Sequence, residues 1–151
     1  MITADNPLPH QRLLDRLLRG GRVLRAARRA RQLEVQARDF LLRSMDTVLE
    51  RGVDRESRSS PRPPTEVAES IGCRPLKEVA RQVADGLRDG GVEHEAAAIV
   101  AVEMRTRMIQ FAVEAIERKL RARLWGEPEI SSVVAWVRAR AEDEYRDGAR
   151  R

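Results

Sequence analysis

The chain has 151 residues, of which 42% are hydrophobic, 35% charged and only 3% aromatic, with a net charge of +5. This length favours one domain over residues 1–151, with a core built from aliphatic side chains. A single cysteine, Cys73, excludes an intramolecular disulfide and a cysteine-based zinc site, and no stretch is apolar enough to span a membrane, so a cytoplasmic protein is expected.

The first fifty-one residues are predicted to form a pair of helices. Leucines at three- and four-residue spacing predict a helix over residues 10–19, with arginines on the opposite face. Gly20 and Gly21 follow, and each lowers helix stability by about 1 kcal/mol relative to alanine. A turn at these glycines would let both halves face one core, so we predict a second helix over 22–51.

Arginine dominates this pair. Between Arg12 and Arg31 there are eight arginines and one acid, Asp15, a local charge of +7 that exceeds the +5 of the whole chain. Guanidinium groups at three- and four-residue spacing can follow a phosphate backbone. The candidate nucleic-acid-binding residues are Arg12, Arg16, Arg19, Arg22, Arg25, Arg28, Arg29 and Arg43.

Two other interpretations of the arginines remain open. The face could simply be solvated, or paired with acids elsewhere such as Glu142, Asp143 and Glu144. It could also meet an anionic membrane, but the apolar side of the second helix is rich in alanine and lacks tryptophan, which disfavours insertion.

Residues 52–64 contain three prolines and three serines and are expected to be a flexible linker to a helical core over 65–147. The core should open with a short helix over 66–71 that Gly72 stops, followed by a helix over 75–89 that ends at Gly90 and Gly91.

The segment 65–81 resembles a helix-turn-helix DNA reader in outline, since Ala68 and Gly72 fit the common pattern. Ser70 lies where such motifs usually carry an apolar residue, and Val79 comes one position late. A helix, a glycine stop and another helix, which any helical bundle can contain, is the simpler interpretation of the segment.

Residues 93–125 contain neither proline nor glycine and predict a long central helix. Its apolar residues form two stripes on opposite faces, which is typical of a helix buried on several sides. Either both stripes are covered by the chain itself or one meets a partner. The first stripe is Ile99, Val102, Ile109, Val113, Ile116 and Leu120, with Thr106 among them, and the second is Ala101, Met104, Met108, Phe111 and Ala115. A last helix over 129–147 and a loose basic tail, 148–151, complete the chain.

Residues suited to catalysis are scarce. His10 and His94 are the two histidines, and neither lies in a metal-binding or catalytic motif. Glu103, Glu114 and Glu117 could act as acids or bases if buried, but pairing with nearby arginines is the simpler explanation. We therefore expect no enzyme, no cofactor and no metal.

The sequence thus predicts an all-α bundle of five or six helices around the long helix at 93–125. The expected function is a non-catalytic subunit of a larger assembly, which contacts nucleic-acid backbone without sequence specificity through the arginines and binds other protein subunits. The alternative is a helical protein–protein adaptor or a self-associating structural protein without nucleic acid. The choice between DNA and RNA stays open.

Overall fold

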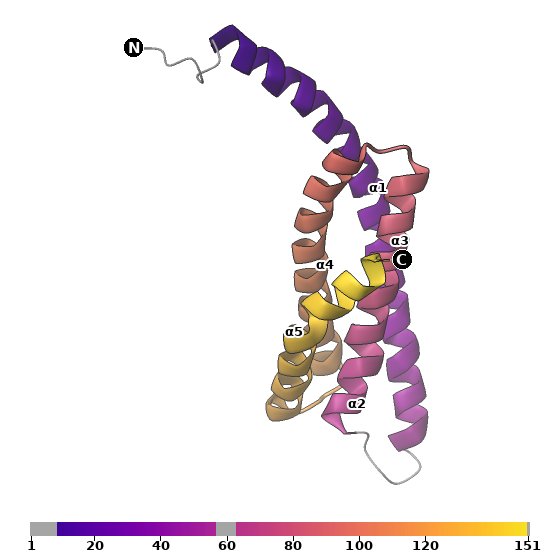
Figure 1. The fold of residues 1–151 in the computed structure, drawn as a ribbon. Coiled ribbons are helices and arrows are strands. Elements are labelled where there is room, and N and C mark those ends of the chain that lie inside the picture. The colour runs from indigo at the N-terminus through magenta and orange to yellow at the C-terminus, as the bar shows by residue number, and fades with distance from the viewer. Residues whose placement is uncertain (1–8, 57–62, 151) are drawn as a thin grey trace.

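The computed structural model describes residues 9–56 and 63–150, and all regular structure in these residues is helical (Figure 1). The elements are α1 (Pro9–Glu56), α2 (Pro64–Ala68), a π-helical turn η1 (Glu69–Cys73), α3 (Arg74–Asp89), α4 (His94–Ala122) and α5 (Glu127–Ala149). Because α2, η1 and α3 follow one another without a break, they form one helical rod. The described residues therefore form four rods: α1, the rod of α2, η1 and α3, α4, and α5. The predicted helical class is confirmed, but the predicted five or six helices are four.

The predicted break at Gly20 and Gly21 is wrong, because α1 is one helix of 48 residues. A Cβ built on Gly21 meets nothing within 4 Å, so no tertiary contact forces a turn there. Two glycines weaken a helix but do not forbid it when long helical segments flank them on both sides. The helix also runs past Gly52 to Glu56, so the first five residues of the predicted linker, 52–56, are helical. Residues 57–62 of that linker lie outside the described part of the chain.

The four rods share one core of aliphatic side chains, with α3 and α4 at its centre. Each of these two helices packs against α1, against α5 and against the other, whereas α1 and α5 make no close backbone contact within the described residues (Figure 1). The predicted long helix is confirmed as α4, with bounds three residues or fewer from those expected. It shares the central place with α3 rather than holding it alone.

The buried row on α4 runs at four-residue steps, which the two predicted stripes did not anticipate. Its members are Ala96, Val100, Met104, Met108, Ala112, Ile116 and Leu120. Each step of four residues advances about 40° beyond a full turn, so the row winds from the second predicted stripe to the first. Ile99 and Val102 are therefore left exposed, although the C-terminal half of their stripe is buried.

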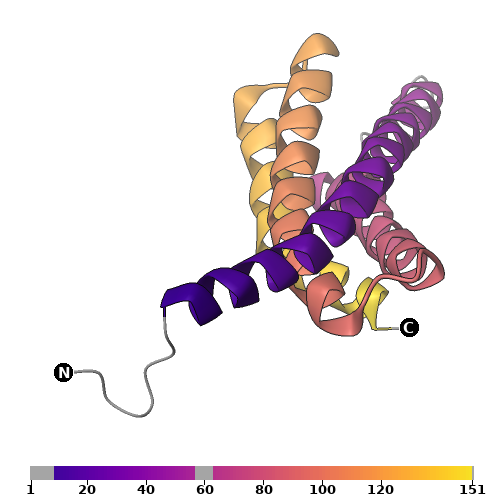
Figure 2. The same cartoon turned by 90° about the horizontal axis from the view of Figure 1, so that it is seen from above.

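Helix α1 buries a similar row, which steps by four residues at all but one place: Ala26, Ala30, Leu33, Ala37, Leu41, Met45 and Leu49. Packing of such rows against each other favours helices that cross at roughly 50° rather than run parallel. Figure 2 shows this oblique crossing of α1 and α4. The small buried residues Ala26, Ala30 and Ala37 allow the neighbouring helices to approach α1 closely.

The predicted stop at Gly72 is wrong, and with it the resemblance to a helix-turn-helix, because residues 64–89 run as one continuous helical rod. Gly72 has helical neighbours on both sides and does not stop the helix. A Cβ at Gly72 would lie 2.7 Å from Val137 Cγ2 and 3.2 Å from Ile116 Cδ1, so the glycine lets α5 and α4 approach. The π-helical turn before Pro75 supplies the local rearrangement that a proline inside a helix requires.

The C-terminal tail is also more ordered than predicted. Helix α5 begins at Glu127 and continues to Ala149, and Gly148 is buried against α3. A Cβ at Gly148 would collide with the backbone carbonyl of Lys77, so the missing side chain permits the contact. Of the predicted loose tail, only Arg151 lies outside the described residues.

Candidate nucleic-acid interface

The arginine-rich segment lies on the N-terminal half of α1, part of which leaves the bundle. In both cartoon views the first turns of this helix project beyond α3, α4 and α5 (Figures 1 and 2). From Arg16 to Leu33 the helix contains seven arginines and no acid. The side chains of Arg12, Arg16, Arg19 and Arg22 lie outside those that the structure describes, so the geometry of the site rests on Arg25, Arg28, Arg29 and Arg43.

Arg25 and Arg28 are exposed and form no ion pair within the described part of the chain. Arg31, which belongs to the same acid-free run but was not among the predicted site residues, is exposed as well. Arg31 could have been predicted as a site residue from the sequence, because it extends the three-residue spacing of Arg25 and Arg28. These three guanidinium groups are the described cations of the segment that a polyanion could reach.

Arg29 has a structural role instead. It is partly buried, and its Nε donates a hydrogen bond of 3.2 Å to the backbone carbonyl of Gly86 in α3. Its Nη1 donates a second bond, also of 3.2 Å, to the side chain of Gln32. Arg29 therefore ties α1 to the last turn of α3.

Arg43 is exposed but paired, since its Nη2 lies 2.8 Å from Asp39 Oδ2 one turn earlier on the same helix. An exposed pair of this kind contributes little to stability, but the negative charge of Asp39 opposes the approach of an anion to Arg43. Arg43 also lies about 20 Å along the helix from Arg29. Arg43 is therefore a weaker candidate than Arg25 and Arg28.

The eight predicted arginines do not share one face on a continuous helix. At 100° per residue, positions 25, 28, 29 and 43 fall within an arc of about 100°. Positions 12, 16 and 19 fall on the other side, because the turn that would have aligned them at the glycines is absent. The basic surface consequently wraps around α1 instead of forming a flat stripe.

Seven of the twelve basic side chains in α3, α4 and α5 form an ion pair with a nearby acid in the described part of the chain. Arg81 pairs with Glu78 and Asp85, and Arg121 with Glu117 and Glu127. Lys119 in α4 reaches Asp46 in α1. The run from Arg16 to Leu33 on α1 therefore differs from the other helices by containing seven arginines and no acid.

The acids proposed as alternative partners for the arginines are engaged elsewhere or point to another surface. Glu144 lies 3.7 Å from Arg140, and Asp143 lies 3.8 Å from Arg146, both within α5. Glu142 lines a groove between α4 and α5. None of the three pairs with a described arginine of α1.

Groups that could support catalysis are poorly placed. Burial raises the pKa of the Cys73 thiol to about 12, and the nearby carboxylate of Glu69 adds to this shift, so the nucleophilic thiolate is disfavoured. His94 is exposed at the start of α4, as are Glu103 and Glu114 further along it. Among the described residues, no cluster of histidine, cysteine or acidic side chains could hold a metal ion, and no helix has the length and apolarity to cross a membrane.

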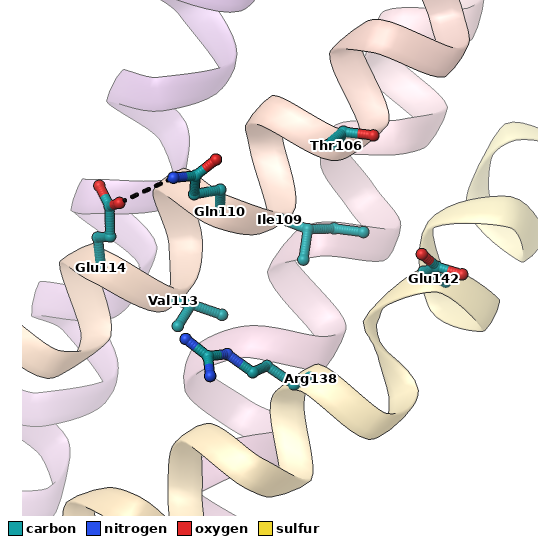
Figure 3. A pocket seen from close by; sticks show the side chains of 7 residues that line it. All are labelled: Thr106, Ile109, Gln110, Val113, Glu114, Arg138 and Glu142. Carbon is teal, nitrogen blue, oxygen red and sulfur yellow. Dashed lines mark hydrogen bonds between the residues drawn. The ribbon is translucent and has the colours of Figure 1, made fainter.

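A second surface feature is the groove between α4 and α5, with a volume of about 390 Å³ (Figure 3). Its apolar part is formed by Ile109 and Val113, and Arg138 and Glu142 face them from α5. Thr106, Gln110 and Glu114 complete the lining, and Gln110 donates a hydrogen bond of 3.2 Å to Glu114.

Comparison with protein-family models, curated proteins and solved structures finds no match to this chain.

Proposed function

We propose that this protein is a non-catalytic subunit that binds nucleic-acid backbone, without sequence specificity, through the N-terminal half of α1. The observation that carries the proposal is the acid-free run from Arg16 to Leu33, on which Arg25 and Arg28 are exposed and unpaired within the described residues. Exposed arginines without acidic neighbours keep their full charge for an external anion, and phosphate is the anion that guanidinium forks match best.

The shape of the segment supports a backbone ligand over separate small anions. Eighteen helical residues extend about 27 Å, which spans several phosphates of a duplex. A helix that carries cations around its circumference can lie in a groove between two phosphate rows. The low aromatic content, 3% of residues, argues against a platform on which single-stranded bases stack.

The proposal is tested by reversing two charges at the described site. Arg25→Glu with Arg28→Glu should weaken binding to a labelled duplex of DNA or RNA by at least about tenfold at low salt, since two attractive contacts become repulsive. Fluorescence anisotropy measures the affinity, and circular dichroism checks that the helical fold is kept. Arg29 is left unchanged because its bond to Gly86 links α1 to α3.

A matched control is available at the far end of α4. Arg118 and Arg123 are both exposed and form no ion pair within the described residues, so Arg118→Glu with Arg123→Glu gives the same change in net charge. This control should retain most of the affinity. Equal losses in the two variants, or no binding by the wild type at low salt, would show that α1 is not the binding site.

A further inference from the structure

The outward face of α4 is an apolar surface that the described chain leaves open. Ile99 and Val102 expose 52% and 54% of their surface, on a helix whose opposite side is buried in the core. They lead along α4 to the partly buried Ile109 and the buried Val113 at the groove between α4 and α5 (Figure 3). Most exposed apolar residues occur singly, so a row that runs into a groove indicates a binding surface.

Acidic side chains border this surface. Glu95, Glu103 and Glu114 lie on the same side of α4, and all three are exposed. Glu142 faces the groove from α5, and Arg138 is the basic residue among the groove's lining. With the partly buried Arg105, which lies one turn from both Val102 and Ile109 on α4, these six residues carry a net charge of −2, from four acids and two arginines, so the surface favours a basic amphipathic helix.

The chain itself contains such a helix at its N-terminal end. Residues 10–19 carry leucines at positions 13, 14, 17 and 18 and arginines at 12, 16 and 19, with Asp15 between them. The net charge of this stretch is +2, from three arginines and one aspartate. The leucine positions fall within an arc of about 140° on a helix, and the arginine positions lie on the other side.

The continuity of α1 prevents this stretch from reaching the α4 face of its own bundle. Helix α1 runs through Gly20 and Gly21 without a turn, and its first turns lead away from the other helices (Figures 1 and 2). On an unbroken helix the leucine positions also lie opposite the row that begins at Ala26. A second molecule can receive the helix without any such break.

We infer that two copies of this chain form a dimer in which residues 10–19 of each copy dock on the α4–α5 face of the other. Ile99, Val102 and Ile109 receive the leucines, and the bordering acids attract the arginines. A reciprocal exchange of this kind closes with two-fold symmetry and leaves no unpaired copy of either surface. Arg25 and Arg28 lie beyond the docked segment and stay available to nucleic acid in the dimer, whereas the arginines at 16 and 19 belong to both proposed surfaces.

Light scattering on the nuclease-treated full-length chain tests the dimer. The wild type should have twice the mass of one chain, and Ile99→Glu with Val102→Glu should be a monomer, because two charges are placed in the apolar contact. Both positions are half exposed, so the fold should tolerate the change. Val35→Glu is a control for an acid placed at an exposed apolar position outside the contact, since Val35 exposes 70% of its surface on α1, and it should remain a dimer.

Crosslinking between two variants identifies the segment that docks. Chains with Leu17→Cys are mixed with chains carrying Val102→Cys, and oxidation should join one of each; the buried Cys73, with its raised pKa, contributes little background. Arg25→Glu with Arg28→Glu should leave the mass unchanged. A monomeric wild type, a dimer that survives Ile99→Glu with Val102→Glu, or crosslinking only when both cysteines are in one chain would overturn the inference.

Discussion

Gly72 lies where three rods meet, and its missing side chain sets how closely they pack. Val137 of α5 and Ile116 of α4 are both fully buried and occupy the space that a Cβ would need. Their methyl groups cannot move without disturbing other core contacts, because protein interiors are close-packed. The residue is therefore required by packing between helices, in a segment where glycine lowers helix propensity.

We predict that Gly72→Ala lowers the free energy of unfolding by about 1–2 kcal/mol. Overpacking in a core costs about 1–3 kcal/mol, and the better helix propensity of alanine offsets up to about 1 kcal/mol of this. Urea denaturation followed by circular dichroism measures the change. Gly21→Ala is the control, since a Cβ there meets nothing within 4 Å, and it should cause no loss. Equal stability of the two variants would refute this account of Gly72.

Tyr145 is buried in the core with a hydroxyl that has no hydrogen-bond partner among the described residues. Burial raises the pKa of this hydroxyl to about 12, so it stays protonated under ordinary conditions. A buried polar group without a partner costs about 1–3 kcal/mol relative to one that is paired. The ring contributes apolar contact, whereas the hydroxyl only adds a desolvation cost.

Tyr145→Phe should therefore keep the packing and raise the free energy of unfolding by about 1 kcal/mol. It should also remove the stability loss that the tyrosine causes in alkali: between pH 10 and about 12 the unfolded chain gives up this proton while the folded chain keeps it, so stability falls. Thermal unfolding of the two proteins at pH 7 and pH 10.5 measures both effects. A clear loss of stability at pH 7 would mean that the hydroxyl is bonded after all.

At the scale of whole elements, α3 and α4 end in the same capping arrangement with different residues. At the end of α3, the backbone N–H of Val92 donates a hydrogen bond to the carbonyl of Leu87, and that of Gly91 donates one to the carbonyl of Arg88. Gly91 has a φ of 68°. At the end of α4, the backbone N–H of Trp125 donates to the carbonyl of Leu120, and that of Leu124 donates to the carbonyl of Arg121. Leu124 has a φ of 62°. This is the Schellman motif, in which the left-handed position normally belongs to glycine.

Substitution of the residue at positive φ should therefore change stability in opposite directions at the two helix ends. Leu124→Gly should stabilise the protein by about 1 kcal/mol, because the leucine is strained at positive φ and is 92% exposed, so it loses few contacts. Gly91→Ala should destabilise it by about the same amount. Guanidinium denaturation of both variants measures the two shifts. Changes of the same sign would show that backbone strain does not govern these ends.

The ends of α3 and α4 could be predicted from sequence, whereas the continuity of the helices through Gly20 and Gly72 could not. Gly90 and Gly91 lie where the apolar pattern also stops, so two local signals agree. Gly72 lies inside a rod because Val137, sixty-five residues later, needs the space. Gly21 has no tertiary contact at all, and the helix simply continues. A single glycine in sequence does not distinguish these three situations.

Which face of α4 is buried could likewise be predicted only in part from the two apolar stripes. The spacing correctly identified Met104 and Met108 as well as Ile116 and Leu120 as buried. The sequence could not reveal that the neighbouring helices cross α4 obliquely, which makes the buried row wind and leaves Ile99 and Val102 exposed. Crossing angles depend on partners from distant parts of the chain.

For the whole molecule, charge is distributed unevenly along the fold. Most described cations of α3, α4 and α5 pair with acids on their own or neighbouring helices, whereas the acid-free run of α1 keeps exposed arginines at positions 25, 28 and 31. The concentration of arginines was visible in the sequence. The bond from Arg29 to Gly86 and the winding of the basic surface depend on α1 being continuous and on the place of α3 beside it.

The measurement that tests the central claim most directly is the salt dependence of duplex binding by the wild type and by Arg25→Ala with Arg28→Ala. For each phosphate that an arginine neutralises, the slope of log affinity against log salt concentration changes by about one. We predict a steep negative slope for the wild type and a slope about two units shallower for the variant. Equal slopes, or no binding by the wild type at low salt, would contradict a nucleic-acid interface on α1.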